Sequence, residues 1–485
     1  MPKVTTEGRR AWTWESLLVE PRRPELIREQ PNAHWFAVGA VCIGALIGQL
    51  DASIVTVALP TLSKAFGASV GAVTWVGLSY LLVLVATVTA LGRFADMWGR
   101  KLLYVYGFVV FIIASAACAL APDLALLCVF RAIQAVGAAM LQANSLAIIV
   151  LCVPQRSLGR AIGLQGAAQA SGLAIGPTVG GALLAAGGWR WIFLVNVPIG
   201  AVGAVAALML VPRSVNLAAR VRFDWRGLGL FFPTVVALLS ALSFGATEGW
   251  GSPVIVGCFA AAVVLGVVFF RQERRISEPM FDLGLFTNRR FTIGIASALC
   301  SYLVMFGILL LLPFYLEGAL GLGAGRAGLE LMAMPLAFGV VAPFAGRLAD
   351  RIGARPLTVL GMALSAFGLF GAGLWRPGTA WLVVLLGVMG VGLGLFTSPN
   401  NAAVMGAAPD QHAGMASGVL NMSRGLGTSL GLAVTGLVFT VAGGSKAHAF
   451  TVTAVVLGVF AVLAGVLSGL RANGSLADTA LSSIE

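Results

Sequence analysis

Long apolar stretches, separated by short polar or charged segments, recur along nearly the whole chain. Fourteen stretches are each about 20 residues long, enough for a helix to cross about 30 Å of hydrocarbon. None alternates apolar and polar residues with a period of two, which disfavours a membrane β-barrel. The sequence therefore predicts an all-α polytopic membrane protein, with spans at about 35–60, 71–92, 102–121, 124–151, 161–186, 191–212, 227–245, 253–270, 291–316, 327–346, 357–375, 380–404, 414–441 and 449–470.

Composition and charge support this class and predict its orientation. The chain is 59% hydrophobic and only 10% charged, and its mean hydropathy is +0.94. Most of the 31 lysines and arginines fall in the loops on one side of the predicted membrane, which is typical of cytoplasmic loops. Both termini are then cytoplasmic, with tails at 1–33 and 471–485. The net charge of +12 indicates this topology and contact with anionic membrane lipids, and no nucleic-acid partner.

Two short segments repeat one another. Gly92-Arg-Phe-Ala-Asp96-Met-Trp-Gly99-Arg100-Lys101 and the segment around Asp350 both read Gly-Arg-x-Ala-Asp-x-x-Gly. We expect each to form a loop in which the glycines allow a tight turn and the acid accepts from the first amides of the next helix. The alternative is an ordinary charged turn between helices. We interpret these residues as part of a gate.

The repeat also divides the chain. It predicts a first six-helix bundle at 34–213 and a second at 291–470, with an inserted helix pair and its flanking loops at 214–290. Parallel halves that enclose a site at their interface are typical of alternating-access carriers.

Asp51 is the one carboxylate deep within a predicted span. An ionisable group in hydrocarbon costs about 2.5 kcal/mol or more and usually has a function. Arg131 lies at a similar depth in the fourth span, and Gln134, Gln142 and Ser145 continue its helix face, which we expect to line a wet cavity. Asp51 either gains and loses a proton during transport or forms a permanent ion pair with Arg131.

The fifth span contains a glycine repeat with a proline. Gly172, Gly176 and Gly180 form a flat face suited to close helix packing, and Pro177 provides a bend. We expect a packing joint between the halves that acts in gating. Simple tight packing is the alternative.

Further candidates for a substrate cavity are polar or aromatic residues in the second half. Aromatic and methionine residues at helical spacing can instead be plain packing, and an intramembrane arginine can reach toward the membrane surface. The candidates are Tyr302, Met305, Phe306, Asn400, Asn401 and Arg424. The sequence has no phosphate-binding loop for ATP, no nucleophile and base pair, and no metal-ligand spacing. We therefore expect no enzyme, no metal and no cofactor, with a proton gradient as the energy source.

Several motifs resemble the major facilitator superfamily, in its fourteen-helix drug:proton antiporter branch. They are 50–60, 92–101, Phe130-Arg131-Ala-Ile-Gln134-Ala-Val-Gly137, 172–181 and Trp189-Arg-Trp-Ile-Phe-Leu-Val-Asn-Val-Pro-Ile-Gly200. The resemblance implies two six-helix bundles around a central cavity, and export against an inward flow of protons. Met97 stands where the second motif usually has Arg, which is expected to weaken the inner gate.

The resulting functional hypothesis is a proton-coupled antiporter that exports lipophilic small molecules from the cytoplasm across a bacterial inner membrane, working as a monomer. One alternative is a dedicated exporter of a single endogenous metabolite or lipid. Another is a membrane sensor that binds a ligand without transporting it.

Overall fold

The computed structural model describes residues 20–214, 223–276, 279–316, 320–322, 329–375, 378–443 and 445–471. Fourteen helices within these ranges are long and apolar enough to cross a membrane, and no β-strand occurs among the residues described. The predicted class and number of spans are confirmed. Of the predicted tails, 1–19 and 472–485 lie outside the described residues.

The spanning helices follow one another with short connections, and the sixth span consists of two consecutive helices. They are α2 (Ala33–Phe66), α3 (Val70–Trp98), α4 (Arg100–Ala119), α5 (Leu124–Cys152), α6 (Leu158–Gly187), α7 (Trp191–Leu194) with α8 (Asn196–Leu210), α9 (Trp225–Glu248), α10 (Pro253–Glu273), α11 (Arg289–Leu316), α13 (Ala333–Ile352), α14 (Ala354–Trp375), α15 (Thr379–Met405), α16 (Ala413–Ala442) and α17 (Lys446–Gly469).

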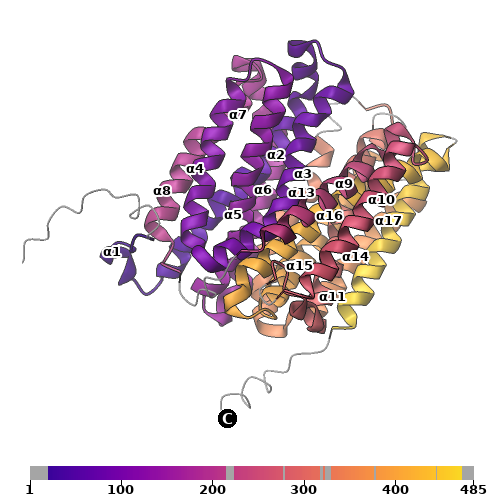
Figure 1. Cartoon of the computed structure of the whole chain (residues 1–485). Coiled ribbons are helices and arrows are strands. Elements are labelled where there is room, and N and C mark those ends of the chain that lie inside the picture. The colour runs from indigo at the N-terminus through magenta and orange to yellow at the C-terminus, as the bar shows by residue number, and fades with distance from the viewer. Residues whose placement is uncertain are drawn as a thin grey trace, which may run out of the picture.

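The helices form two bundles that lie side by side (Figure 1), α2 to α8 in one and α11 to α17 in the other. The bundles meet where α3 packs on α16 and where α6 packs on α13. Helix α9 contacts both α3 and α16, and α10 packs on α9. The inserted pair therefore lies against one seam between the halves.

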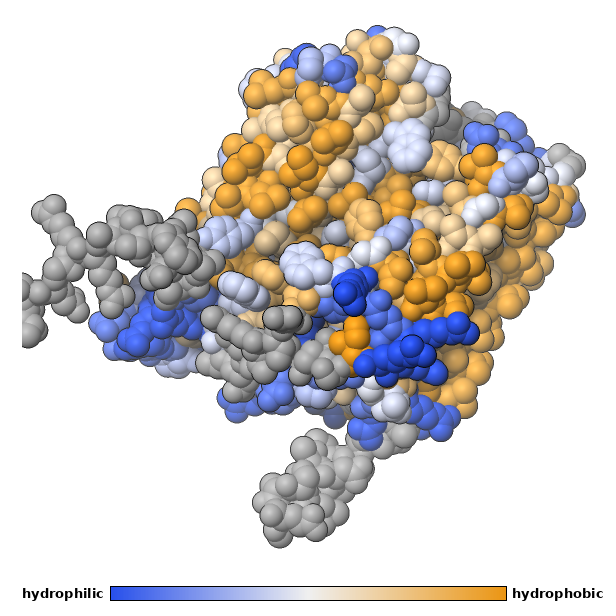
Figure 2. All heavy atoms as spheres, in the orientation of Figure 1, coloured by the Kyte–Doolittle hydropathy of each residue, from blue (hydrophilic) through white to orange (hydrophobic). Residues whose placement is uncertain are grey.

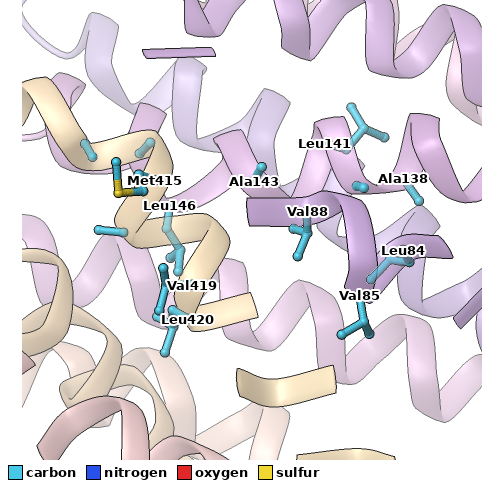
Figure 3. Packing of buried hydrophobic residues seen from close by; sticks show 14 of the residues in the cluster. Leu84, Val85, Val88, Ala138, Leu141, Ala143, Leu146, Met415, Val419 and Leu420 are labelled. Carbon is cyan, nitrogen blue, oxygen red and sulfur yellow. The ribbon is translucent and has the colours of Figure 1, made fainter. Parts of the chain in front are cut away.

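Apolar side chains fill the seam formed by α3, α5 and α16. Figure 3 shows Val85 and Val88 of α3 near α5, and Met415 and Val419 of α16 near Leu146 of α5. On the outside, Figure 2 shows hydrophobic residues over the flanks of the helices and hydrophilic residues gathered toward the two ends. This distribution fits a protein surrounded by hydrocarbon.

Two helices run past the ends that the sequence indicated. Helix α2 continues beyond Pro60 to Phe66 and ends where Gly67 takes a φ of 59°. Helix α3 includes Gly92 and Asp96, and ends only at Gly99, whose φ is 119°. The predicted loop at 92–101 was therefore wrong for its first part, because only Gly99 has the backbone conformation that stops the helix. Helices α3 and α13 both end on the same side of the molecule, which we call the basic end.

Candidate functional site

Asp51 lies midway along α2 and is fully buried. Its Oδ2 accepts a hydrogen bond from Arg131 Nη1 at 2.7 Å. Its Oδ1 accepts from Gln134 Nε2 at 3.0 Å and from Asn196 Nδ2 at 2.7 Å. Three donors converge on two oxygens that can only accept when ionised, so the geometry suits a charged carboxylate. The contact with Arg131, which the sequence left open, is present.

The guanidinium of Arg131 is enclosed by three helices. Its Nε donates to the carbonyl of Val76 at 3.1 Å, and its Nη1 also donates to Gln134 Oε1 at 2.6 Å. Its Cζ lies 4.2 Å from the centre of the Tyr80 ring, within the range of a cation–π contact. The charge of Arg131 is thus held by α2, α3 and α5 and balanced by Asp51.

Asn196 at the start of α8 is the part of this network that the sequence analysis missed. It is fully buried and is the third donor to Asp51. The sequence did contain a clue to Asn196, which is an amide residue within an apolar span and belongs to the motif at 189–200. Gln134 extends the network, since its Nε2 lies 2.7 Å from Ser115 Oγ of α4.

Two residues of the polar stripe on α5 lie against neighbouring helices instead of the predicted wet cavity. Gln134 and Ser145 are buried, and Ser145 Oγ accepts from Gln165 Nε2 of α6 at 3.3 Å. Gln142 is half-buried, and its carbonyl accepts from Asn421 Nδ2 of α16 at 3.0 Å. The side chains of Gln134 and Ser145 have hydrogen-bond partners on neighbouring helices, so their burial does not require water beside them.

A pocket between the two halves, which we call the central pocket, includes two of the predicted cavity residues. Its lining consists of Gln49, Gln169, Ala170, Leu173, Tyr302, Met305, Met334, Pro335, Phe338 and Leu393. Phe306 stacks on Tyr302, with ring centres 6.1 Å apart. Gln49 and Gln169 were missed, although each is an amide in an apolar span. Asp51 is not part of the lining.

The remaining predicted cavity residues lie outside this lining. Asn400 donates to the carbonyl of Gly294 at 3.0 Å and accepts from Arg471 Nη2 at 2.6 Å. Burial lowers the pKa of Arg471 to about 10. Asn401 is also buried in α15. Arg424 on α16 is buried and lies 5.4 Å from the centre of the Tyr302 ring, so it is an interior charge that does not reach the membrane surface.

Asp96 closes the basic end by binding the opposite half. It pairs with Arg100 and accepts from the backbone amides of Gly414 and Met415, both at 2.8 Å. These amides open α16, where the helix dipole favours a negative charge. Arg100 Nη2 donates to the carbonyl of Asp410 at 2.7 Å. The prediction that the acid accepts from the first amides of the next helix was wrong, because the facing helix of the other half supplies the amides.

Asp350 repeats this arrangement in the other direction. It accepts from the amides of Gly159 at 2.8 Å and Arg160 at 3.2 Å, at the start of α6. Backbones touch beside both acids, since a Cβ on Gly92 would overlap the carbonyl of Gly414 and one on Gly159 would overlap that of Gly346. The two halves are therefore closed against each other at the basic end.

The glycine face of α6 packs within the first half. A Cβ on Gly172 would lie 2.5 Å from the carbonyl of Leu46, and Gly176 and Gly180 face Ser53 and Ile54 of α2. Pro177 is exposed within α6. The prediction that this segment is a joint between the halves was wrong, because its close partner is α2.

Comparison with known proteins identifies the class. The family model described as Major Facilitator Superfamily matches residues 41–286 and 294–478, and the chain belongs to this family. It is 34% identical to an uncharacterized transporter of Escherichia coli K12, YebQ, over 90% of this chain and 95% of YebQ. It is 36% identical to the multidrug resistance protein Stp of Mycobacterium tuberculosis over 82% of this chain and 74% of Stp.

Two further similarities bear on function and fold. The chain is 33% identical to the riboflavin transporter RibZ of Clostridioides difficile, over 82% of this chain and 87% of RibZ. The crystal structure of the human organic anion transporter MFSD10 matches with a TM-score of 0.67 at 16% identity, over 90% of this chain and all of that one. That structure supports the fold alone. The protein is a multi-pass membrane transporter of the major facilitator superfamily.

Proposed function

We propose that this transporter is a proton-coupled antiporter that exports lipophilic small molecules. The observation that carries the proposal is Asp51, a buried carboxylate in mid-span held by Arg131, Gln134 and Asn196. An ionisable group within a membrane is costly and usually serves a function. The three donors stabilise the ionised carboxylate in this conformation, so Asp51 takes up a proton in a conformation in which these contacts are broken. The name of Stp supports a drug-like cargo.

Asp51 would couple proton binding to cargo binding through α2. In this conformation the carboxylate is fully buried, so a proton reaches it only after the helices rearrange. Protonation removes the charge that balances Arg131, and an unbalanced buried charge costs about 3–5 kcal/mol. That cost favours a different arrangement of the helices around Asp51. Gln49 on the same helix lines the central pocket, so cargo contacts the element that the proton moves.

The membrane potential supplies a sufficient driving force. One proton that crosses about 100 mV releases about 2.3 kcal/mol, which corresponds to a roughly fifty-fold gradient of cargo. In the proposed orientation the basic end and both termini face the cytoplasm of a bacterial inner membrane, and the conformation described is closed to the cytoplasm. We propose that the protein acts as a monomer with protons, lipids and cargo as its only partners, and needs no cofactor.

The second candidate is dedicated export of one metabolite, which the name of RibZ favours. The two proposals differ in how many compounds move and compete. A single compound that saturates transport, with drugs and dyes unaffected, would select the dedicated exporter.

The test uses purified protein in liposomes with an imposed pH gradient and a panel of lipophilic dyes of different charge: the cationic ethidium, the neutral Nile red and the anionic dansylglycine. We expect gradient-driven dye movement in the parent and none in Asp51→Asn. The matched control is Asp123→Asn, because Asp123 is an exposed helix cap whose Oδ1 accepts from Leu126 N, and Asn caps equally well. Gradient-driven transport by a folded Asp51→Asn variant at the parent rate would refute proton coupling through Asp51.

A further inference from the structure

Arg424 is a buried cation that, unlike Arg131, has no counter-ion among the residues that the structure describes. It lies on α16 and is 4% exposed. Its Nη1 donates to Asn421 Oδ1 at 3.0 Å. Its Nε and Nη2 are buried and make no hydrogen bond to any residue that the structure describes. Within the same residues, no carboxylate lies within ion-pair distance of it. A charge inside a membrane protein is normally paired, because an unpaired one is costly.

The two unused donors lie on one edge of the guanidinium. In arginine, Nε–H and one terminal N–H₂ point the same way and form a fork that matches two oxygens of a carboxylate or phosphate. Asn421 occupies the opposite terminal nitrogen, Nη1. The edge left over is therefore the one that binds an oxyanion with two parallel hydrogen bonds.

Arg424 is held in place beside the central pocket. Asn421 donates to the carbonyls of Gln142 at 3.0 Å and Ser417 at 2.9 Å, which fixes the amide oxygen that Arg424 binds. The guanidinium lies 5.4 Å from the centre of the Tyr302 ring, which lines the pocket together with Met305. The cation of Arg424 thus lies next to a residue of the pocket wall, while Arg424 itself is outside the lining.

We propose, on the basis of the export function above, that the cargo is an amphiphilic anion whose acidic group pairs with Nε and Nη2 of Arg424. Its carboxylate, sulfonate or phosphate oxygens supply the counter-charge that the described residues lack. Its apolar part packs on Tyr302 and Met305, and the central pocket, whose cavity volume is about 20 Å³ in this conformation, widens to admit it. A cationic compound of the same shape is repelled by the same guanidinium. The site therefore selects cargo by charge as well as by lipophilicity.

The experiment is equilibrium binding to purified protein in nanodiscs, with no gradient. The fluorescent probes are dansylglycine, its neutral amide, and the cationic dansylcadaverine, which share one ring system. We expect the parent to bind dansylglycine more tightly than the amide, and dansylcadaverine least. Loss of two charge-assisted hydrogen bonds in Arg424→Gln should weaken the binding of dansylglycine by roughly 100-fold or more and leave the binding of the amide unchanged. Arg424→Lys keeps the charge without the fork and should retain a weaker preference for the anion.

Two controls make the result specific. Arg190→Gln removes one positive charge from an exposed position at the opposite end and should bind all probes as the parent does. Circular dichroism and gel filtration establish that the variants are folded. The proposal is overturned if the parent binds dansylglycine and its amide equally well, or binds neither. It is also overturned if Arg424→Gln retains the preference for the anion. Because binding is measured without a gradient, a failure of proton coupling at Asp51 leaves this result unaffected, and the reverse also holds.

Discussion

Gly159 offers the sharpest test of how the basic end stays closed. Gly159→Ala adds one methyl group where the carbonyl of Gly346 already lies too close for a Cβ, and where Asp350 Oδ1 would be 2.6 Å away. Helices α6 and α13 must separate to accommodate it, which also weakens the hydrogen bond from Gly159 N to Asp350. Overpacking costs about 1–3 kcal/mol, and the weakened bond to a charged acceptor adds about 1 kcal/mol.

The combined penalty applies only to the conformation closed at the basic end. A cost of about 2–4 kcal/mol shifts the equilibrium between the two conformations by roughly 30- to 700-fold. Replacing Gly by Ala also stabilises a helix by up to about 1 kcal/mol, but this gain is equal in both conformations and cancels. We therefore expect Gly159→Ala to be largely open at the basic end.

Spin labels at Arg156 and Arg351, both exposed, report the separation of α6 from α13 in a background without the native cysteines. Pulsed electron resonance should give a short, narrow distance distribution in the parent and a longer one in Gly159→Ala. Gly77→Ala is the matched control, because a Cβ there meets no atom within 4 Å. A folded Gly159→Ala protein with the distances of the parent would refute the reasoning.

Two further substitutions test the charged contacts. Arg131→Met leaves Asp51 buried without its counter-ion and should lower the free energy of unfolding by about 3–5 kcal/mol, measured by denaturant unfolding in detergent. Adding Asp51→Leu should restore most of the loss. No restoration would contradict the role of the ion pair. Asp96→Asn removes the charge that binds the amides of Gly414 and Met415 and should open the basic end. A cysteine placed between the two halves near this end should then react faster with a thiol reagent. Unchanged labelling would mean that this contact does not keep the end closed.

The membrane spans were predictable because hydrocarbon imposes their length and composition. Helix ends were less so, since they depend on backbone conformation at single residues. Pro60 suggested an end that α2 does not have, because a proline removes only one bond of a helix that its neighbours support. The end of α3 is set by the positive φ of Gly99, and the sequence does not distinguish that glycine from Gly92 by type.

The charged pair of the site could be predicted from the sequence, but the contacts of the surrounding residues could not. The depth of Asp51 and Arg131 indicated that they could meet. Whether a polar helix face points to water or to another helix depends on the tertiary arrangement, so Gln134 was assigned to a cavity although it binds Asp51. A glycine repeat likewise indicates close packing without naming the partner, and Gly172 packs on α2 of its own half.

In the proposed mechanism, helix α2 carries proton binding on one face and cargo binding on another, and Gln49 tests this separation. Gln49 and Asp51 are two residues apart, about 200° around the helix axis; the first lines the central pocket and the second faces Arg131. Gln49→Ala should remove one neutral hydrogen bond to cargo of about 1 kcal/mol, which raises the KM for transport about five-fold. The dependence of the rate on the imposed pH gradient should stay that of the parent, because the Asp51 network is intact. Both quantities, the KM and the dependence of the rate on the gradient, are measured in liposomes. An unchanged KM with a lost response to the gradient would place both functions on one face of α2 and contradict the proposed arrangement.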